Sequence, residues 1–472
     1  EPGMSPVELW CNEAQERYVL VIEAEQLARF DALCRRERCP YAVVGEITSD
    51  GWLKVEDPLL RTPPVDLPLE VILGKPPKMT RDVRSEQPFR DDFDESSIDL
   101  REALYRLLRF PAIADKTFLI SIGDRTVGGL ISRDPFVGPW QVPVSDVAVT
   151  ISGYTSTTGE AFAMGERTPL ALLNAPASGR MAVAEAITNI VAADIEKLSD
   201  VRLSANWMAA CGEPGEDADL FATVKAVGEE FCPALGITIP VGKDSLSMKT
   251  SWRDANGEER KMLAPVSLIV SAFAPVKDVR RTWTPQLRTD RGDTRLILID
   301  LGAGRDRLGG SALAQVYGKL AAEPPDCDDP QRLARFFAAM VELRDRDLVL
   351  AYHDRSDGGL FATLVEMAFA GHCGIDVDLG EQPRAIAALC SEELGAVLQV
   401  NTSDVAAVEA VLARHQLEDL SRTIGTVVAE DRVRIRAGAR TLVDESRTAL
   451  HRAWSETSFR MTQLRDDPTC AK

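Results

Sequence analysis

The most concentrated set of chemically capable side chains lies in the segment YHDRSDGG, residues 352–359. Two carboxylates, Asp354 and Asp357, stand there beside a histidine and an arginine. The segment follows the apolar run DLVLAY and precedes LFATLVEMAFAG, a predicted amphipathic helix. A strand that opens through glycines into a helix is where α/β proteins place ligands. Asp354 could hold a cation there while backbone amides hold phosphate; the alternative is that an Asp or Ser only caps the helix.

Oxygen ligands elsewhere in the chain could complete a metal site. Asp146 lies in the apolar, β-like run VPVSDVAVTI, where a buried carboxylate is costly without a cation. Glu185 and Asn189 are four residues apart in a predicted helix, so both face one side of it. Oxygen ligands without Cys or His suit Mg²⁺. The four residues Asp146, Glu185, Asn189 and Asp354 can be combined into one oxygen-only magnesium site; a solvent-facing aspartate and a solvated Glu–Asn pair are the alternatives.

Two glycine-containing segments are weaker candidates for phosphate binding. LGAGRDRLGGSALAQVYG follows a predicted strand and leads to Ser311 at a helix start, which suits a phosphate cradle or a capped connection equally. Gly242 to Ser245 resembles the end of a P-loop, but Asp244 stands where Ser or Thr belongs, so a P-loop is rejected. The chain has no G-x-S-x-G motif, which leaves serine-nucleophile chemistry little support.

The elements that must position these residues predict an α+β, or mixed α/β, fold, because strands such as KTFLISIG and PVSDVAVTI mix with long helices. The charged, proline-containing stretch at 76–97 predicts an exposed linker. The predicted parts, in order, are the end of one domain at 1–75, the linker at 76–97, a second domain at 98–276, a third at 277–440 and a helical tail at 441–472.

An internal repeat underlies this division. Residues 11–57 and 390–438 both read as strand, amphipathic helix, strand, turn and strand, and Cys11 and Glu13 fall on Cys390 and Glu392. Chance similarity is the alternative. The second copy is preceded by its own strand at 295–301 and by helices, whereas only ten residues precede the first. The pattern therefore predicts that the domain of the first copy is truncated and that the chain is a fragment.

Composition excludes several classes of function. The 54 Lys and Arg against 73 Asp and Glu give a net charge of −19, which argues against a nucleic-acid or anionic-membrane binder. Nine cysteines without a C-x-x-C argue against a zinc site and a disulfide framework, and fit reduced thiols. The longest mostly apolar run, 262–276, is too short to span a membrane. We therefore expect a cytoplasmic protein.

Several long motifs give the chain a specific resemblance to a known family. These motifs span essentially the whole chain: SPVELWCNEAQERYVL, IGDRTVGG, DPFVGPWQVPVSD, AFAMGERTPLALL, LSANWMAACGEPGEDADL, PVGKDSLSMKT and HDRSDGGL. Through them the chain resembles the large, multidomain phosphoribosylformylglycinamidine synthases, which use ATP and glutamine in purine biosynthesis. In that family the synthetase region is a tandem duplication of an aminoimidazole-ribonucleotide-synthetase-like fold, in agreement with the repeat. The chain would be the end of the first half and all of the second.

The resemblance implies a site and a reaction. In the family, ATP activates the amide oxygen of formylglycinamide ribonucleotide, and ammonia from a glutaminase domain then gives the amidine. The second half holds a Mg²⁺–nucleotide (ATP or ADP), largely structural in role. The positions that match its metal ligands are Asp146, Glu185, Asn189 and Asp354, and those that match its nucleotide contacts are Ser145 and Ser356. Lys116 and Asp124 resemble positions near the active site between the halves.

The resemblance also implies what this chain would need. The glutaminase domain and most of the first half lie outside the sequence, so full amidotransferase activity is not expected of these residues alone. Three readings follow: a segment of the ligase, a non-catalytic nucleotide-stabilised scaffold that docks the missing parts, and a stand-alone ATP-using relative. The truncated first copy argues against the third.

Overall fold

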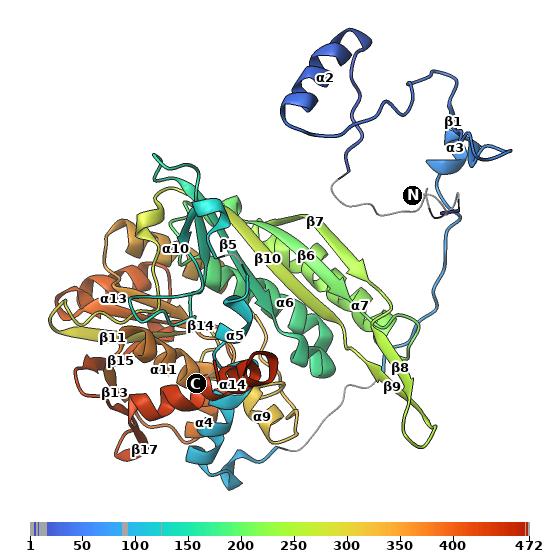
Figure 1. Cartoon of the computed structure of the whole chain (residues 1–472). Helices are drawn as coiled ribbons and strands as arrows, with labels where there is room; N and C mark the ends of the chain where they lie inside the picture. Colours follow the sequence, from blue (N-terminus) through green and yellow to red (C-terminus); the bar gives the residue numbers. More distant parts are fainter. Residues whose placement is uncertain are drawn as a thin grey trace. The chain divides into compact units, whose positions relative to one another are not determined.

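The structure is a computed structural model that describes residues 4–5, 8, 17–86, 93–123, 125–467 and 469–470. The chain divides into two compact units, residues 1–82 (unit 1) and 83–472 (unit 2). The division falls inside the stretch 76–97 that the sequence predicts as a linker. Figure 1 shows both units, coloured along the chain from blue to red.

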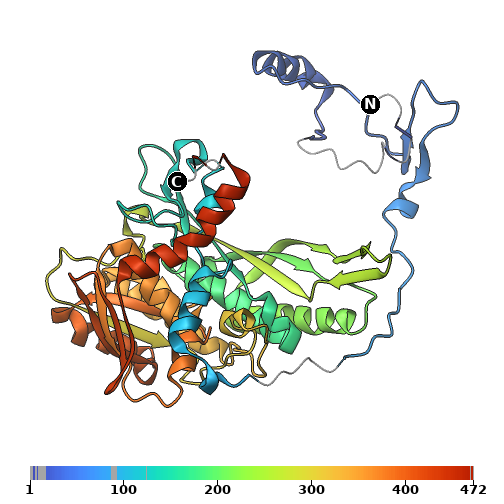
Figure 2. The same cartoon turned by 60° about the horizontal axis from the view of Figure 1, so that its bottom comes forward.

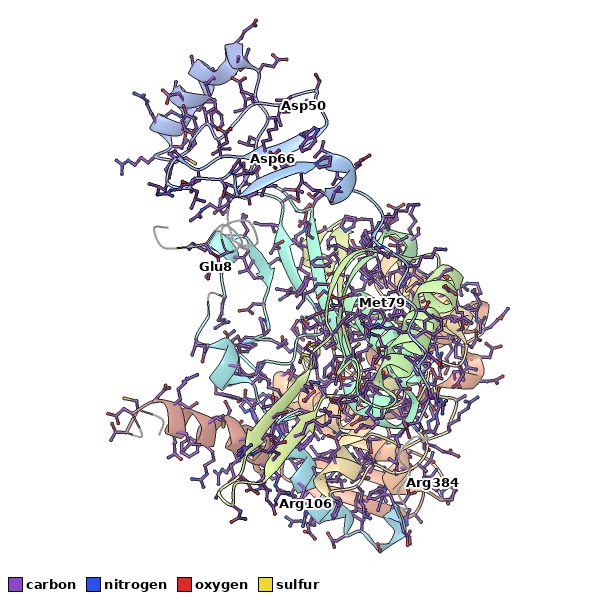
Figure 3. The ribbon with its side chains drawn as sticks, turned by 90° about the vertical axis from the view of Figure 1, so that its right-hand side faces the viewer. Glu8, Asp50, Asp66, Met79, Arg106 and Arg384 are labelled. Atoms are coloured by element: carbon purple, nitrogen blue, oxygen red, sulfur yellow. The ribbon has the colours of Figure 1, made fainter. Side chains whose placement is uncertain are left out.

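The described part of unit 1 contains a helix, a small antiparallel pair of strands and a second, short helix. The helix α2 (Leu27–Arg36) follows a short 3₁₀ turn at 24–26, and β1 (Trp52–Val55) pairs with β2 (Val65–Pro68) before the short helix α3 (Leu69–Ile72). Asp50 fixes the start of β1, because its carboxylate accepts hydrogen bonds from Trp52 N at 3.1 Å and Thr48 Oγ1 at 2.8 Å. Figure 3 labels Asp50 and Asp66 on this hairpin.

The first copy of the repeat only partly forms the elements that the sequence predicts. Its helix and last strand are present as α2 and β1, but the strands predicted on either side of the helix are wrong, because 17–22 and 41–48 form no strand. Val19 is 90% exposed and Val44 is 86% exposed. Apolar segments of this kind need a neighbouring strand to complete their hydrogen bonds. In the described part of unit 1, β1 and β2 pair with each other and neither pairs with these segments.

The N-terminal part of unit 2 is a six-stranded sheet in the order β3-β4-β5-β10-β6-β7. The sheet is mainly antiparallel, with β6 and β7 parallel. Its strands are β3 (Ile131–Arg133), β4 (Ala148–Ile151), β5 (Gly159–Glu166), β6 (Arg202–Met208), β7 (Thr238–Ser245) and β10 (Ser267–Val276). A hairpin of β8 (Lys249–Arg253) and β9 (Glu259–Leu263) extends from it.

Helices cover one face of this sheet and leave the other open. The helices α6 (Ala171–Ile190) and α7 (Glu216–Lys225) lie on the same face (Figure 2), followed by α8 (Cys232–Leu235). Residues of β5 alternate between buried and exposed, as expected of a strand with one covered face. On the open face Phe162, Met164 and Phe273 are exposed, and the rings of Phe162 and Phe273 lie 5.0 Å apart.

The C-terminal part of unit 2 is a seven-stranded sheet in the order β12-β14-β11-β15-β13-β16-β17. All its pairs are antiparallel except β13 with β16. Its strands are β11 (Thr294–Asp300), β12 (Ala351–Asp354), β13 (Gly374–Asp378), β14 (Gly395–Asn401), β15 (Ser421–Val428), β16 (Val433–Ala437) and β17 (Arg440–Glu445). Its helices are α4 (Leu100–Arg109), α5 (Thr117–Ile120), α9 (Ala312–Val316), α10 (Pro330–Asp345), α11 (Gly359–Gly371), α12 (Ala385–Cys390), α13 (Val405–Arg414) and α14 (Arg447–Arg465).

The end of the chain is more closely integrated than the sequence predicts. The predicted boundary at 440 cuts through β17, which pairs with β16. The helix α14 packs against α4, and Trp454, 2% exposed, donates from its indole nitrogen to Ile113 O at 2.9 Å. Figure 2 shows α14 beside α4. The apolar side of this helix therefore belongs to the core of unit 2.

The predicted mixed α/β fold is confirmed by the two sheets and their helices. Among the described helices, none has the length and apolar composition that a membrane crossing requires.

Candidate metal site

The strand β12 carries Tyr352, His353 and Asp354 to the start of α11. The turn between strand and helix needs glycine, because Gly358 and Gly359 have φ of +80° and +67°. A Cβ on Gly359 would also lie 2.6 Å from Ser391 O. The sequence therefore forces a sharp exit from β12 that leaves Asp354 3% exposed at the end of the strand.

Asp146 and Asp354, two of the four residues that the sequence groups as possible metal ligands, lie together at this point. Asp146 precedes β4, and its carboxylate, 1% exposed, lies together with His353 and Asp354 in one group of metal-capable atoms within 4.8 Å of one another. Asp146 Oδ1 is 2.7 Å from His353 Nδ1 and accepts the Asp354 amide at 3.3 Å. Its other oxygen, Oδ2, is buried without a hydrogen-bond partner among the described residues.

His353 lies between two carboxylates, those of Asp146 and Glu366, and holds Asp146 in place. Its Nε2 lies 2.9 Å from Glu366 Oε2, so both ring nitrogens face carboxylates. Burial alone would lower the pKa of His353, but Asp146 and Glu366 outweigh it and raise the pKa well above its usual value. An imidazolium with both N–H groups engaged orients Asp146 and leaves no nitrogen for a metal.

The carboxylate of Asp354 carries a strongly raised pKa. Burial, followed by the neighbouring Asp146, raises the pKa of Asp354 to about 7. Two buried carboxylates side by side, one with an unpartnered oxygen, fit a hard divalent cation. Such a cation would offset both the repulsion between the two carboxylates and the cost of burying an oxygen without a partner. The residues present therefore suit Mg²⁺.

The helix α6 brings Glu185 and Asn189 towards the same region. Gly165 in β5 permits a very close approach of α6, since a Cβ there would lie 2.0 Å from Ala182 O. Glu185 Oε2 accepts the Glu166 amide at 2.7 Å, and Asn189 Nδ2 donates to Met164 O at 3.0 Å. The prediction that both side chains share one helix face is confirmed, because both reach the backbone of β5.

Thr188, between these two residues, joins α6 to β12. Its hydroxyl lies 3.3 Å from Asp354 Oδ2, and its carbonyl accepts the Tyr352 hydroxyl at 2.6 Å. Burial raises the pKa of Glu185, with further contributions from Asp357 and Asp354 and an opposite one from Arg167. Glu185 lies outside the group that Asp146, His353 and Asp354 form.

The two serines of the predicted nucleotide contacts lie beside the acids. Ser356 Oγ is 3.4 Å from Asp354 Oδ1, and Ser145 Oγ donates to Val147 O at 2.9 Å. Lys116 Nζ donates to Ala112 O at 3.0 Å and to Ala114 O. Burial lowers the pKa of Lys116, against the opposite influence of Glu366 and Asp357. Asp124 lies outside the described residues.

An ion-pair network next to the acids, buried at Arg167 and Glu392 and exposed at Asp357, was missed by sequence reasoning. Arg167, 3% exposed, donates to Asp357 Oδ1 at 2.8 Å and to Glu392 Oε2 at 2.6 Å. Glu392 also accepts the amides of Gly358 and Ala312, at 2.8 Å and 2.9 Å. The network ties the end of β5 to the turn before α11. The sequence singles out Asp357 beside Asp354 and matches Glu392 to Glu13 in the repeat, but it does not join either carboxylate to Arg167.

The four glycine amides of the loop after β11 are already hydrogen bonded within the protein. Gly302 N and Gly304 N donate to the Asp300 carboxylate at 3.0 Å and 2.7 Å. Gly309 N and Gly310 N donate to backbone carbonyls, each at 2.7 Å. Of the two interpretations weighed for this loop, the structure favours the capped connection, in which Ser311 caps α9.

Comparison with known proteins agrees with this architecture. Residues 115–275 match the family model of the FGAR-AT PurM_N-like domain. Residues 1–57 and 293–438 match the C-terminal domain of AIR synthase related proteins, so both copies of the repeat fall in ranges matched by one model. This chain is a synthetase-domain region of the phosphoribosylformylglycinamidine (FGAM) synthase family.

Solved structures of this family share the fold. Thermotoga maritima PurLQS is 13% identical, with a TM-score of 0.52 over 81% of this chain and 53% of that chain. T. maritima PurL complexed with FGAR is 12% identical, with a TM-score of 0.52 over 75% of this chain and 53% of that one. T. maritima PurL complexed with ATP is 12% identical, with a TM-score of 0.51 over 75% and 52%. The chain thus spans about half the length of these FGAM synthase structures.

Proposed function

We propose that this chain supplies the part of an FGAM synthase that holds a magnesium–nucleotide, ATP or ADP. The metal ligands are Asp146, Glu185, Asn189 and Asp354, and Ser145 and Ser356 contact the nucleotide. The observation that carries the proposal is the buried Asp146 Oδ2, which has no hydrogen-bond partner among the described residues and lies beside Asp354. Structures of T. maritima PurL with ATP, ADP and AMPPCP support a nucleotide as the ligand of this fold.

The chemistry of each proposed ligand follows from its surroundings. His353 orients Asp146 and Thr188 orients Asp354, so that their remaining oxygens can bind a cation without reorganisation. Glu185 and Asn189 are held by the backbone of β5, each with one oxygen that does not take part in that contact. Bound Mg²⁺ would neutralise phosphate charge, and the role of the nucleotide in this half is structural.

Thermal unfolding with Mg²⁺ and ADP tests this site. A ligand that binds only the folded state adds about 2.7 kcal/mol at ~100 times its Kd. We expect a rise in melting temperature that Asp146→Asn and Asp354→Asn abolish. Asp244→Asn, which changes an exposed carboxylate on β7, serves as the matched control and should retain the rise. An equal rise in all four proteins would refute these ligands.

We further propose that the site serves the whole ligase, which converts formylglycinamide ribonucleotide, glutamine and ATP into the amidine in the cytoplasm. The T. maritima PurL structure with FGAR supports this substrate. The partners are a first synthetase half and a glutaminase domain, with Lys116 and Asp124 near the shared active site. The open face of the six-stranded sheet, with Phe162, Met164 and Phe273 exposed, offers an apolar surface for the first half.

Reconstitution tests this second step. The 472-residue chain alone should form no amidine from glutamine and ATP, and addition of a first half and a glutaminase should restore product. Phe162→Glu should weaken that restoration. Phe221→Glu, which changes an exposed side chain of α7, should not. If the added parts bind without restoring product, the chain is a nucleotide-stabilised scaffold and the catalytic proposal is wrong.

A further inference from the structure

The end of helix α2 places two cysteines in a defined pair. Cys39 N donates to Cys34 O at 2.9 Å, and Arg38 N donates to Arg35 O at 3.3 Å, with Arg38 at φ +54°. These two bonds around a left-handed residue are the Schellman helix ending, which is frequently accompanied by a side-chain contact between its first and last residues. Here these two residues are cysteines, and their side chains hydrogen bond to each other.

Further contacts hold the second cysteine against the helix. Pro40 follows Cys39 and restricts the backbone. Tyr41 then folds back on α2, because its hydroxyl donates to Asp31 Oδ1 at 3.0 Å and its ring meets Phe30 edge-on at 5.1 Å. The backbone of the helix end, together with Pro40 and Tyr41, therefore fixes the position of Cys39 relative to Cys34.

The second copy of the repeat shows what a purely structural pair looks like. At the end of α13, Leu417 N donates to Leu412 O at 2.8 Å, and Gln416 has φ +56°. Leu412 and Leu417 occupy the positions of the two cysteines and are both fully buried. Two leucines satisfy the packing that this motif requires, so packing does not explain a thiol at both positions.

The two thiols differ in access. Cys34 is 7% exposed, whereas Cys39 faces solvent. Burial, and then the nearby Cys39 thiol with which it hydrogen bonds, raises the pKa of the Cys34 thiol. Cys39 is thus positioned to react first with a solute and Cys34 to resolve the product.

We propose that Cys34 and Cys39 form a redox-active dithiol that closes to a disulfide by exchange with a low-molecular-weight disulfide such as oxidised glutathione. The Cys39 thiolate attacks one glutathione sulfur, which forms a mixed disulfide and releases one glutathione thiolate. The Cys34 thiolate then attacks Cys39 Sγ and releases the second glutathione. Two protein thiols are oxidised, one glutathione disulfide is reduced to two thiols, and the two protons go to the released glutathione.

Peptide mapping of the full chain after treatment with oxidised glutathione tests the proposal. Trypsin cuts after Arg35, Arg36 and Arg38, so a Cys34–Cys39 disulfide joins the peptides 30–35 and 39–54. We expect this linked pair, lighter by two hydrogens than its separate parts. Cys470, which is exposed, should carry glutathione as a mixed disulfide and so confirms that the oxidant reached the protein.

Two variants separate the pair from general thiol reactivity. Cys34→Ser should stop the reaction at a glutathione adduct on Cys39. The double change Cys34→Leu with Cys39→Leu copies the second copy, should fold, and should give neither product. Glutathione that remains on Cys39 of the unmodified protein, or a Cys34 that stays free for alkylation, would overturn the proposal.

Discussion

The two copies of the repeat give different structures from similar sequences. In the second copy, β14, α13, β15 and β16 are all present and their apolar residues are buried, as with Leu398 at 0% and Ile424 at 2% exposure. In the first copy only the helix and the last strand form, and Val19 and Val44 stay exposed. The helices match in length and in how they end and the last strand forms in both copies, whereas the strands on either side of the helix form only in the second copy.

The reason lies in one strand. Both β14 and β15 pair with β11, which runs between them. The described part of unit 1 has no strand in that position. A helix satisfies its hydrogen bonds within its own segment, but a strand needs a neighbour. The comparison shows that a strand pattern in the sequence becomes a strand only where its partner exists.

Hydrogen exchange should show the largest difference between the copies. Amides of β14 and β15 in the core open only with global unfolding, so their exchange should be slowed by at least ~10³-fold. Amides of 18–22 and 42–47 should exchange nearly as fast as in an unfolded chain. Mass spectrometry of matched peptides measures both. Strong protection of 42–47 in the isolated chain would break the comparison.

The ion pairs of the two units should differ almost as much. Arg167→Met leaves the buried Glu392 without its cation, and Asp357, which is 44% exposed, loses its partner as well. The uncompensated charge of Glu392 should cost about 3–5 kcal/mol in free energy of unfolding. Arg35→Met removes the pair with Asp31 in unit 1, whose arginine is 80% exposed, and should cost at most about 0.5 kcal/mol. Urea titration of both variants gives the comparison, and a loss below 1 kcal/mol at Arg167 would contradict it.

The same contrast explains what the sequence could predict. Motifs made by neighbouring residues were predicted well, such as the shared face of Glu185 and Asn189 and the turn that follows Asp354. The apolar run around Asp146 indicates that this carboxylate needs a cation, but it does not show that Asp354 lies beside it; that grouping rests on the shared ligand type and on the family resemblance. Arg167 could not be assigned, because Asp357 and Glu392 lie 190 and 225 residues away and no local pattern joins them. The prediction of strands on either side of α2 was wrong for the same reason, because a local pattern does not show whether a partner strand is present.

The acids of the two units should respond to pH in opposite directions. Hydrogen bonds from Thr48 and Trp52 lower the pKa of Asp50 in unit 1, so its contribution to stability is present above the unfolded pKa and is lost as pH falls. The pKa of Asp354 is raised to about 7, so the metal-free site binds a proton that the unfolded chain releases near pH 4. Metal-free stability at this site should therefore fall as pH rises from about 4 to about 7.

Metal binding should show the counterpart of this effect. A cation needs the ionised carboxylate, so affinity should rise about tenfold per pH unit below pH ~7 and level off above it. Mn²⁺ in place of Mg²⁺, followed by its electron paramagnetic resonance signal without nucleotide, measures this directly. Asp244→Asn should leave the profile unchanged. Binding of the metal should release about one proton per site. Affinity that does not vary between pH 5.5 and 7.5 would therefore contradict a metal bound by Asp354.

The two helix ends should show the smallest difference between the copies, because a glycine substitution there should have the same effect in both. Arg38 and Gln416 both hold the left-handed position at a helix end, with φ of +54° and +56°. Glycine there removes a steric penalty, so Arg38→Gly and Gln416→Gly should each stabilise the helix end by about 0.5–1 kcal/mol. The amides of the last turn of α2, which open locally, should then exchange about two to five times more slowly, while α13 should show the gain in the urea midpoint of unit 2. Equal gains would confirm that helix endings are set locally in both copies. A gain at Gln416 alone would mean that α2 also depends on a partner that the described part of unit 1 does not supply.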